Sequence, residues 1–518
     1  MLNTIARTDS PALRALVLAL ALATAACGTL GEEGPPVGRV VGGGEIGLVA
    51  GEDALARRVA REVLAREGTA ADAAVAYFFM AAVSYPSRVS LASGGLCLSY
   101  EEAENQTRLL DFRNRPASTE GNGLPIPGAV RGMSALQAVH GSLAWHDLLV
   151  PAERAARFGV PVSPALARDL AHASGTLLGN AEARRLFASP AGGMPGVGDP
   201  LVQFELSDAL SGIRTRGASD FYRGRTARSI IEAAHEAGRV IAIEELGAYA
   251  VAWSDPATFA YERGLMASDL AVQVPDETID AGASTLTALT LLDDAGSMDG
   301  DAERYHLLAE VALRLAVARG SPGTVNLMES YSATRATDPA ALPGSPAPLS
   351  ESPSATGVVT ADRMGNAVAC VFTMNGLFGD GSVLPGTGIV IPASSGADET
   401  LLPVIVVNNV LRSVVLAGTA TGGSASPVVM SQVLLDTLDD SVSLDEAVRR
   451  TRVHHPGVPH VVLVEGAPED KAGEALAIRG HAVEGVAELG RVLAIHCPDG
   501  LRNAPASCVA VTDPRVPD

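Results

Sequence analysis

The stretch that decides the fold is SPSATGVVTADRMGNAVACVFTMNGLFGDGSVLPGTGIVI, residues 352–391. Two runs rich in β-branched and small apolar residues, 358–360 and 367–372, flank the turn Met364-Gly365-Asn366. Gly365 supplies the positive φ that a tight turn needs, and Asn366 tolerates one. The pattern predicts a β-hairpin whose first strand begins at Thr356.

The segment before the hairpin, residues 321–355, is rich in Ser, Pro, Gly and Ala and has little apolar periodicity. We therefore predict an exposed connection there. If the peptide bond before Thr356 is cut, Thr356 becomes a chain terminus, and its free α-amine can serve as base for its own hydroxyl. The alternative is that Thr356 is an ordinary strand residue.

Length and charge bound the class of protein. At 518 residues the chain has ample material for a large core, and length alone suggests about three domains, although layered α/β architectures also run this long as one unit. The net charge of −21 argues against a surface that binds nucleic acid or anionic membranes, because such surfaces attract Lys and Arg.

The N-terminus has the residue pattern of an export signal. Arg7 and Arg14 precede an apolar run, residues 15–26, which ends in Ala25-Ala26-Cys27. We predict a signal peptide over residues 1–26, a lipid-modified Cys27, and a Gly/Pro-rich linker over residues 27–44. The protein would then be exported, periplasmic and anchored through its lipid, since the run is too short to span a membrane permanently. The alternative is an ordinary signal peptide with an incidental cysteine.

Export permits disulfides among the remaining cysteines. Cys97 and Cys370 lie in apolar, strand-like runs, and we predict that they behave as small core residues. Cys497 and Cys508 flank a loop between two strand-like runs, which makes a bridge across a hairpin plausible. No spacing in the sequence suggests a metal site.

Several motifs in and after the hairpin are polar or rich in glycine: Gly365-Asn366 in the turn, and then Thr373-Met374-Asn375, Phe378-Gly379 and Gly386-Thr387-Gly388-Ile389. An alanine-rich helix pattern, GTAADAAVA at 68–76, lies far before the hairpin. Together they resemble the γ-glutamyltransferases, N-terminal-nucleophile hydrolases that cut themselves just before a threonine. The resemblance implies an α+β fold, a four-layer αββα sandwich, with residues 45–355 as the large subunit and 356–518 as the small one. Periodicity alone predicts only mixed α and β.

The resemblance also implies a function and a site. It implies an enzyme that hydrolyses or transfers the acyl group of glutathione or another small γ-glutamyl or acyl amide, without cofactor or metal. Thr356 would be the nucleophile and Thr373 would orient its hydroxyl. The expected site residues are, for catalysis, Thr356, Thr373, Gly422 and Gly423, and, for substrate binding, Arg113 and Asn375.

The supporting roles have physical reasons and simpler alternatives. The amides of Gly422 and Gly423, which enter a helix, suit an oxyanion, and the alternative is a plain glycine turn. Arg113 suits the substrate's α-carboxylate, and the alternative is a surface arginine. We interpret His454 and His455 as structural, and His146 and His235 as helix-surface residues.

Three departures from the family pattern matter. Counting back from Gly365, the family's nucleophile falls on Ala355, so Thr356 is one residue late and would face the other side of a regular strand. The block at residues 390–397, VIPASSGA, lacks the acids and amides that hold the substrate amine in the family. Glu399-Thr400 stands where the family has paired serines that hold the carboxylate.

Two hypotheses follow. One is a self-cleaving amide hydrolase or acyltransferase with an altered acyl preference. The other is an exported lipoprotein that keeps the fold for binding or structure without catalysis. The covalent state of the purified protein discriminates between them, because self-cleavage yields two fragments.

Overall fold

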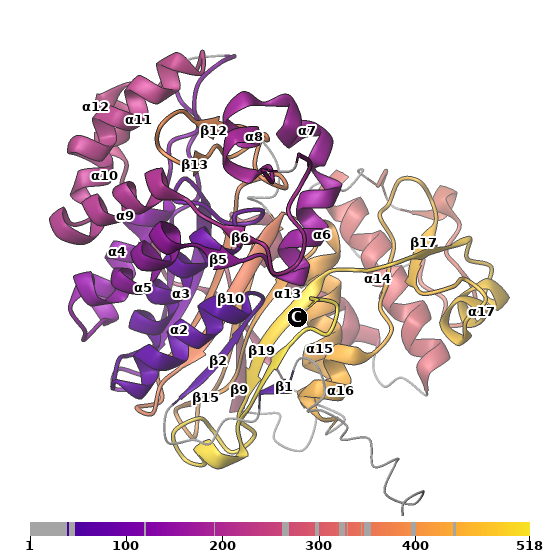
Figure 1. Ribbon diagram of the computed structural model, residues 1–518. Coiled ribbons are helices and arrows are strands. Elements are labelled where there is room, and N and C mark those ends of the chain that lie inside the picture. Colours follow the sequence, from indigo (N-terminus) through magenta and orange to yellow (C-terminus); the bar gives the residue numbers. More distant parts are fainter. Residues whose placement is uncertain are drawn as a thin grey trace, which may run out of the picture. The chain divides into compact units, whose positions relative to one another are not determined.

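The computed structural model describes residues 39–40, 47–118, 121–190, 192–261, 269–295, 300–320, 327–328, 330–342, 344–346, 354–394, 400–438 and 442–517. Residues 38–518 form one compact unit (Figure 1). The predicted signal peptide, Cys27 and most of the predicted linker lie outside the described residues. In the described ranges, no helix is both long and apolar enough to cross a bilayer.

Two antiparallel sheets form the centre of this unit. The first has the order β1 (Arg39–Val40), β20 (Val509–Thr512), β19 (Arg491–His496), β15 (Ser413–Thr421), β14 (Leu402–Asn408), β9 (Leu270–Val274) and β8 (Ala257–Tyr261). The second has the order β2 (Leu48–Gly51), β10 (Ala355–Ala361), β11 (Ala367–Thr373), β3 (Gly94–Glu101), β4 (Gln106–Asp111) and β7 (Ala252–Ser254). The sheets meet where β10 and β11 pack on β15.

Short strands complete the described topology. They are β5 (Val160–Pro161) with β6 (Pro200–Leu201), β12 (Val383–Leu384) with β13 (Ile389–Val390), and β16 (Val453–His454), β17 (Val462–Glu465) and β18 (Val483–Val486). Of these pairings, β17 with β18 is parallel.

Helices cover the outer face of each sheet (Figure 1). On the side of the second sheet lie α2 (Ala54–Ala65), α3 (Ala70–Ser84), α4 (Ala129–His140), α5 (Trp145–Phe158), α6 (Pro164–His172), α7 (Ser174–Gly179), α8 (Ala181–Phe187), α9 (Phe204–Arg216), α10 (Ser219–Arg223), α11 (Arg225–Glu236) and α12 (Ile243–Ala248). On the side of the first lie α13 (Asp280–Ala295), α14 (Asp301–Gly320), α15 (Ser426–Leu438), α16 (Leu444–Arg449) and α17 (Lys471–Ile478).

Helix α3 shows how the sequence forms a buried layer. Every residue of this alanine-rich helix is buried, because α2, α4 and α5 surround it and the second sheet lies beneath it. Its start is fixed by a cap at Thr69: Thr69 Oγ1 accepts from the Asp72 N–H at 3.2 Å, and Asp72 Oδ2 accepts from the Thr69 N–H at 3.1 Å. This reciprocal capping satisfies two amides that a helix start otherwise leaves free.

The predicted hairpin is confirmed as β10 and β11. Their ladder pairs residue for residue, from Ala355 opposite Thr373 to Ala361 opposite Ala367, and Gly365 in the turn has a φ of 96°. The first strand begins at Ala355, one residue earlier than predicted.

The cysteines differ in part from the prediction. Cys497 and Cys508 form the expected bridge across the loop between β19 and β20. Cys97 and Cys370 are buried core residues in strands, as predicted, but they also form a second disulfide that was not predicted. The reason is register: β3 lies beside β11, and Cys97 is the direct cross-strand partner of Cys370.

Candidate active site

A glycine turn ends β15 in the first sheet. Gly422 has a φ of 129° and Gly423 a φ of 66°, and the chain passes from them through a short 3-10 helix into α15. A Cβ atom on Gly422 would overlap with the Cα atom of Gly490, so the turn requires glycine for both conformation and space. Backbone amides that enter a helix in this way suit a developing oxyanion.

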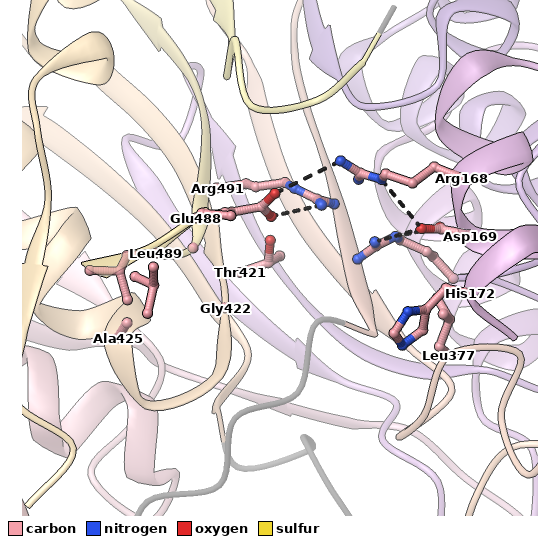
Figure 2. A pocket seen from close by; sticks show the side chains of 14 residues that line it. Arg168, Asp169, His172, Leu377, Thr421, Gly422, Ala425, Glu488, Leu489 and Arg491 are labelled. Carbon is pink, nitrogen blue, oxygen red and sulfur yellow. Dashed lines mark hydrogen bonds and ion pairs between the residues drawn. The ribbon is translucent and has the colours of Figure 1, made fainter. Parts of the chain in front are cut away.

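A cavity of about 410 Å³ opens beside this turn (Figure 2). Within the described chain, Gly422 is the one predicted site residue in its lining. The lining residues are Arg88, Arg168, Asp169, His172, Leu377, Thr421, Gly422, Ala425, Val486, Ala487, Glu488, Leu489, Gly490 and Arg491. They come from α6, the segments after α3 and β11, the end of β15 and the segment before β19, which brings together parts of the chain hundreds of residues apart.

Buried ion pairs form one wall of the cavity. Arg88 Nε and Nη2 donate to the two carboxylate oxygens of Asp169 at 3.2 and 3.3 Å. Arg491 contacts Glu52 at 3.2 Å and Glu488 at 2.7 Å. Figure 2 shows Arg168 between the two groups, 3.9 Å from Asp169 and 4.0 Å from Glu488.

These pairs keep charge inside the protein. Burial raises the pKa of the Glu52 carboxyl, and the positive charge of Arg491 offsets only part of that shift. Burial opposes the charge on Arg88, but its neighbours Tyr85, Asp169 and Glu52 raise the pKa of the guanidinium overall. Removing one member of a buried pair leaves the other charge uncompensated, at a cost of about 3–5 kcal/mol.

Arg88 connects the cavity to the start of β10. Its Nη1 donates to the carbonyl oxygen of Ala355 at 3.5 Å. This carbonyl belongs to the peptide bond that joins Ala355 to Thr356, the bond at which the sequence predicts cleavage. A buried guanidinium on that oxygen favours any state in which the oxygen becomes negative.

Residues of β10 alternate between two faces. Thr360 Oγ1 donates to the carbonyl oxygen of Ala70 in α3 at 2.7 Å, so its side chain faces the helices. Val359 belongs instead to the core shared with the first sheet, as does Ala355. Because the ladder is continuous, Thr356 lies on the helix-covered face with Thr360.

Thr373 belongs to the other face. It lies directly opposite Ala355 in the ladder, and side chains of opposed residues point the same way. The methyl group of Ala355 therefore stands beside the Thr373 side chain. Thr356 Oγ1 is fully buried and has no hydrogen-bond partner among the described residues. The one-residue offset seen in the sequence thus persists in the fold, with no bulge in the ladder to correct it.

The remaining predicted residues lie outside the lining of this cavity. Arg113 holds Asp111 through both carboxylate oxygens, with Nη2 2.7 Å from Oδ2 and Nε 3.1 Å from Oδ1. Asn375, at a φ of 57°, donates its backbone N–H to Thr373 Oγ1 at 2.9 Å. Glu399 lies outside the described residues.

The two histidines predicted on helix surfaces are exposed, and the two interpreted as structural are buried. His146 and His235 are exposed on α5 and α11. His454 is buried, and its Nε2 lies 3.1 Å from Ser424 Oγ, directly after the glycine turn. Burial lowers the pKa of His454 to about 3, so the ring is neutral at neutral pH.

Sequence reasoning missed the charged wall of the cavity. Nothing in the sequence around Arg88 marks a buried arginine. Asp169 and Glu488 each look like an ordinary charge on a helix or loop. Only tertiary contact makes them a group, so a single sequence carries no signal for it.

Comparisons with known proteins show what the chain is similar to in sequence. A family model described as Gamma-glutamyltranspeptidase matches residues 56–395 and 397–518. The glutathione hydrolase proenzyme of Escherichia coli (strain K12) is 26% identical over 524 residues, which cover 88% of this chain and 89% of the relative. Glutathione hydrolase 7 of Homo sapiens is 28% identical over 519 residues, which cover 88% of this chain and 76% of the relative.

Two solved structures are similar in fold. A cephalosporin acylase from Bacillus halodurans superposes with a TM-score of 0.75 at 22% identity, covering 94% of this chain and 97% of the acylase. The gamma-glutamyltranspeptidase of Helicobacter pylori gives a TM-score of 0.50 at 26% identity, covering 54% of this chain and 84% of the solved one. These matches confirm the predicted αββα fold class.

Proposed function

Because the chain belongs to the gamma-glutamyltranspeptidase family, we propose that it is an amide hydrolase or acyltransferase that cuts its own precursor before Thr356. The family match carries the general activity, hydrolysis or transfer at an amide. The cut would separate residues 45–355, as a large subunit, from residues 356–518, as a small one. The contact of Arg88 with the Ala355 carbonyl is the observation that supports processing at this bond.

Self-cleavage begins at Thr356. Its Oγ attacks the carbonyl carbon of Ala355, the C–N bond breaks as the C–O ester bond forms, and the Thr356 nitrogen takes the proton that the hydroxyl loses. Arg88 stabilises the negative charge that passes through the Ala355 oxygen. Water then hydrolyses the ester, leaving a carboxylate on Ala355 and a free α-amine on Thr356.

Turnover uses the new terminus. Freed from the preceding peptide, Thr356 can turn toward Thr373, which orients its hydroxyl, and the α-amine takes the hydroxyl proton as Oγ attacks the substrate carbonyl. The N–H groups of Gly422 and Gly423 stabilise the oxyanion. The amine of the substrate then leaves with the proton that the Thr356 α-amine had taken. The acyl group, now bound to Thr356 Oγ, passes to water or to an acceptor amine. The cavity beside Gly422, lined by both signs of charge, accommodates a small polar acyl donor.

The acyl group differs from that of typical γ-glutamyl substrates in this proposal. Arg113, the expected carboxylate-binding residue, is already paired with Asp111. The sequence lacks the amine-binding block at residues 390–397 and has Glu399 near the carboxylate position. A γ-glutamyl anilide should therefore be a poor substrate. A kcat/KM on the order of 10⁴ M⁻¹s⁻¹ or more for this compound would contradict this part of the proposal.

The test of processing is a denaturing gel of the purified protein. It must be run under reducing conditions, because the Cys97–Cys370 disulfide joins the two expected fragments. Wild type should give two bands, Thr356→Ala should give one band and no amide turnover, and the neighbouring control Ser354→Ala should behave as wild type. Processing that survives Thr356→Ala removes Thr356 from the mechanism.

A second candidate is a family member that keeps the fold without catalysis. The observation that favours it is the orientation of β10, in which Ala355 faces Thr373 and the Thr356 hydroxyl is buried toward the helices. In that case the wild-type chain stays whole. Ala355→Thr, which adds a hydroxyl on the Thr373 side, should then begin to cut, whereas two bands from the wild type reject this candidate.

Export and lipidation of Cys27 are part of the proposal and rest on the sequence of residues 1–27. Mass spectrometry of the membrane fraction should find Cys27 acylated and at the new N-terminus. Recovery of unprocessed Met1 on protein from the soluble fraction alone would contradict it.

A further inference from the structure

Three potential metal ligands converge away from the cavity of Figure 2. His306 and Glu310 are one turn apart on α14 and therefore share a face of that helix. His481 comes from the segment after α17. One ligand atom from each of the three lies within 4.8 Å of the others, and all three residues are buried.

The distances suit a common ion. His306 Nδ1 is 2.7 Å from His481 Nε2, and His481 Nε2 is 3.8 Å from Glu310 Oε1. Two ligands that each bind zinc at about 2.1 Å in a tetrahedral site lie about 3.4 Å apart. The observed distances lie on either side of this value, so metal binding would open the shorter one and close the longer one.

Hydrogen bonds from neighbouring groups also orient two of the ligands. His306 Nε2 lies 2.6 Å from the carbonyl oxygen of Ser332, so this nitrogen carries the proton and Nδ1 faces the centre of the cluster with its lone pair. Glu310 Oε1 accepts from the Thr337 N–H at 2.9 Å, and Oε2 accepts from Thr337 Oγ1 and Arg314. Such outer contacts are what orient the ligands of metal sites.

We propose that His306, Glu310 and His481 form a binding site for a zinc-like divalent cation. Two imidazole nitrogens and one carboxylate oxygen are ligands that zinc accepts, with water in the fourth position. No motif in the sequence predicts this site, because His306 and His481 are 175 positions apart and meet only through the contact of α14 with α17.

The ion would connect α14 with the segment after α17, and residues Ser332 and Thr337 hold the two ligands of α14 in place. His306 and Glu310 precede the Ala355–Thr356 bond and His481 follows it. If the proposed cleavage takes place, the ion holds the two pieces together. Metal binding itself does not depend on that cleavage, so the two proposals fail separately.

The test is zinc binding by the full chain. The protein is stripped with a chelator, re-equilibrated with Zn²⁺ alone, desalted and analysed for metal per chain by mass spectrometry. We expect one tightly held zinc, a rise in melting temperature on adding it, and a visible d–d band of tetrahedral type with Co²⁺. His306→Ala and His481→Ala should lose all three signals, and the exposed-histidine control His235→Ala should keep them.

Thr337→Val covers the case in which a histidine variant fails to fold. It removes only the hydroxyl behind Glu310, and the expected effect is a 10–100-fold weaker zinc affinity by competition with a chelating dye. A wild-type chain that retains no stoichiometric zinc overturns the proposal, and so does zinc retention unchanged in both His481→Ala and Thr337→Val. In either case the two histidines form a hydrogen-bonded pair and nothing more.

Discussion

The Cys97–Cys370 disulfide should be the larger covalent contributor to stability in the uncut chain. Its two cysteines are 273 positions apart, whereas Cys497 and Cys508 are separated by 11. In the chain-entropy description, a cross-link stabilises by restricting the unfolded chain, and the effect grows with the logarithm of the loop. That relation gives about 5–6 kcal/mol for the long loop and about 3 kcal/mol for the short one, a difference of about 2–3 kcal/mol.

The perturbation is the pair Cys97→Ala/Cys370→Ala, with Cys497→Ala/Cys508→Ala as the matched control. Both double variants are made in Thr356→Ala, so that every chain stays uncut and the loops remain closed. Equilibrium urea unfolding, followed by fluorescence and circular dichroism, gives the free energy of unfolding for each. Both pairs are buried, which limits the packing difference between the two variants.

Loss of the long-loop bridge should lower the free energy of unfolding more than loss of the short-loop bridge. An equal or smaller loss would refute the entropic reasoning and place the stabilisation in the native packing of each bridge. The same bridge affects the processing assay. In a cut wild-type chain, a non-reducing denaturing gel should show one band and a reducing gel two.

Three further predictions test the site. Gly422→Ala, whose Cβ has no room, should lower kcat by about 10²–10³-fold as an oxyanion donor is displaced, measured in steady-state assays with the best amide substrate found. Asp111→Asn weakens the hold on Arg113 and should lower KM for a γ-glutamyl anilide, with Asp111→Glu as the control that keeps the pair. Burial lowers the pKa of His454 to about 3 in the folded protein, compared with about 6.5 in the unfolded chain. The neutral ring therefore contributes stability that is fully present above the unfolded pKa and is lost as pH falls through the folded pKa. Urea unfolding between pH 7 and 4 should therefore show a smaller acid-dependent loss of the free energy of unfolding in His454→Gln, by up to about 3 kcal/mol, and an unchanged pH dependence would contradict the shift.

Local chemistry made the hairpin and α3 predictable. The turn at Gly365 is present as predicted, and the cap at Thr69 likewise depends only on residues within four positions. Strand alternation also carried information about the site, because the one-residue offset of Thr356 is visible in the sequence and the fold keeps it.

Non-local contacts were not predictable from the same sequence. Cys97 pairs with Cys370 because β3 happens to lie beside β11, and no pattern in either strand specifies that neighbour. Arg88 and Arg491 look like surface charges until the fold buries them against carboxylates. Each of these contacts spans tens to hundreds of residues, and single-sequence patterns describe only what is close along the chain.

A folded state is expected for both candidate functions. The second sheet interleaves segments from both sides of residue 355: β10 pairs with β2 and β11 pairs with β3. The Cys97–Cys370 disulfide and the buried Arg491–Glu52 pair also cross that point. A cut at Ala355–Thr356 would therefore leave every one of these contacts in place, so the cut chain should stay folded. A folded, stable protein is compatible with either function, so the decision rests on the covalent state of the bond that Arg88 contacts.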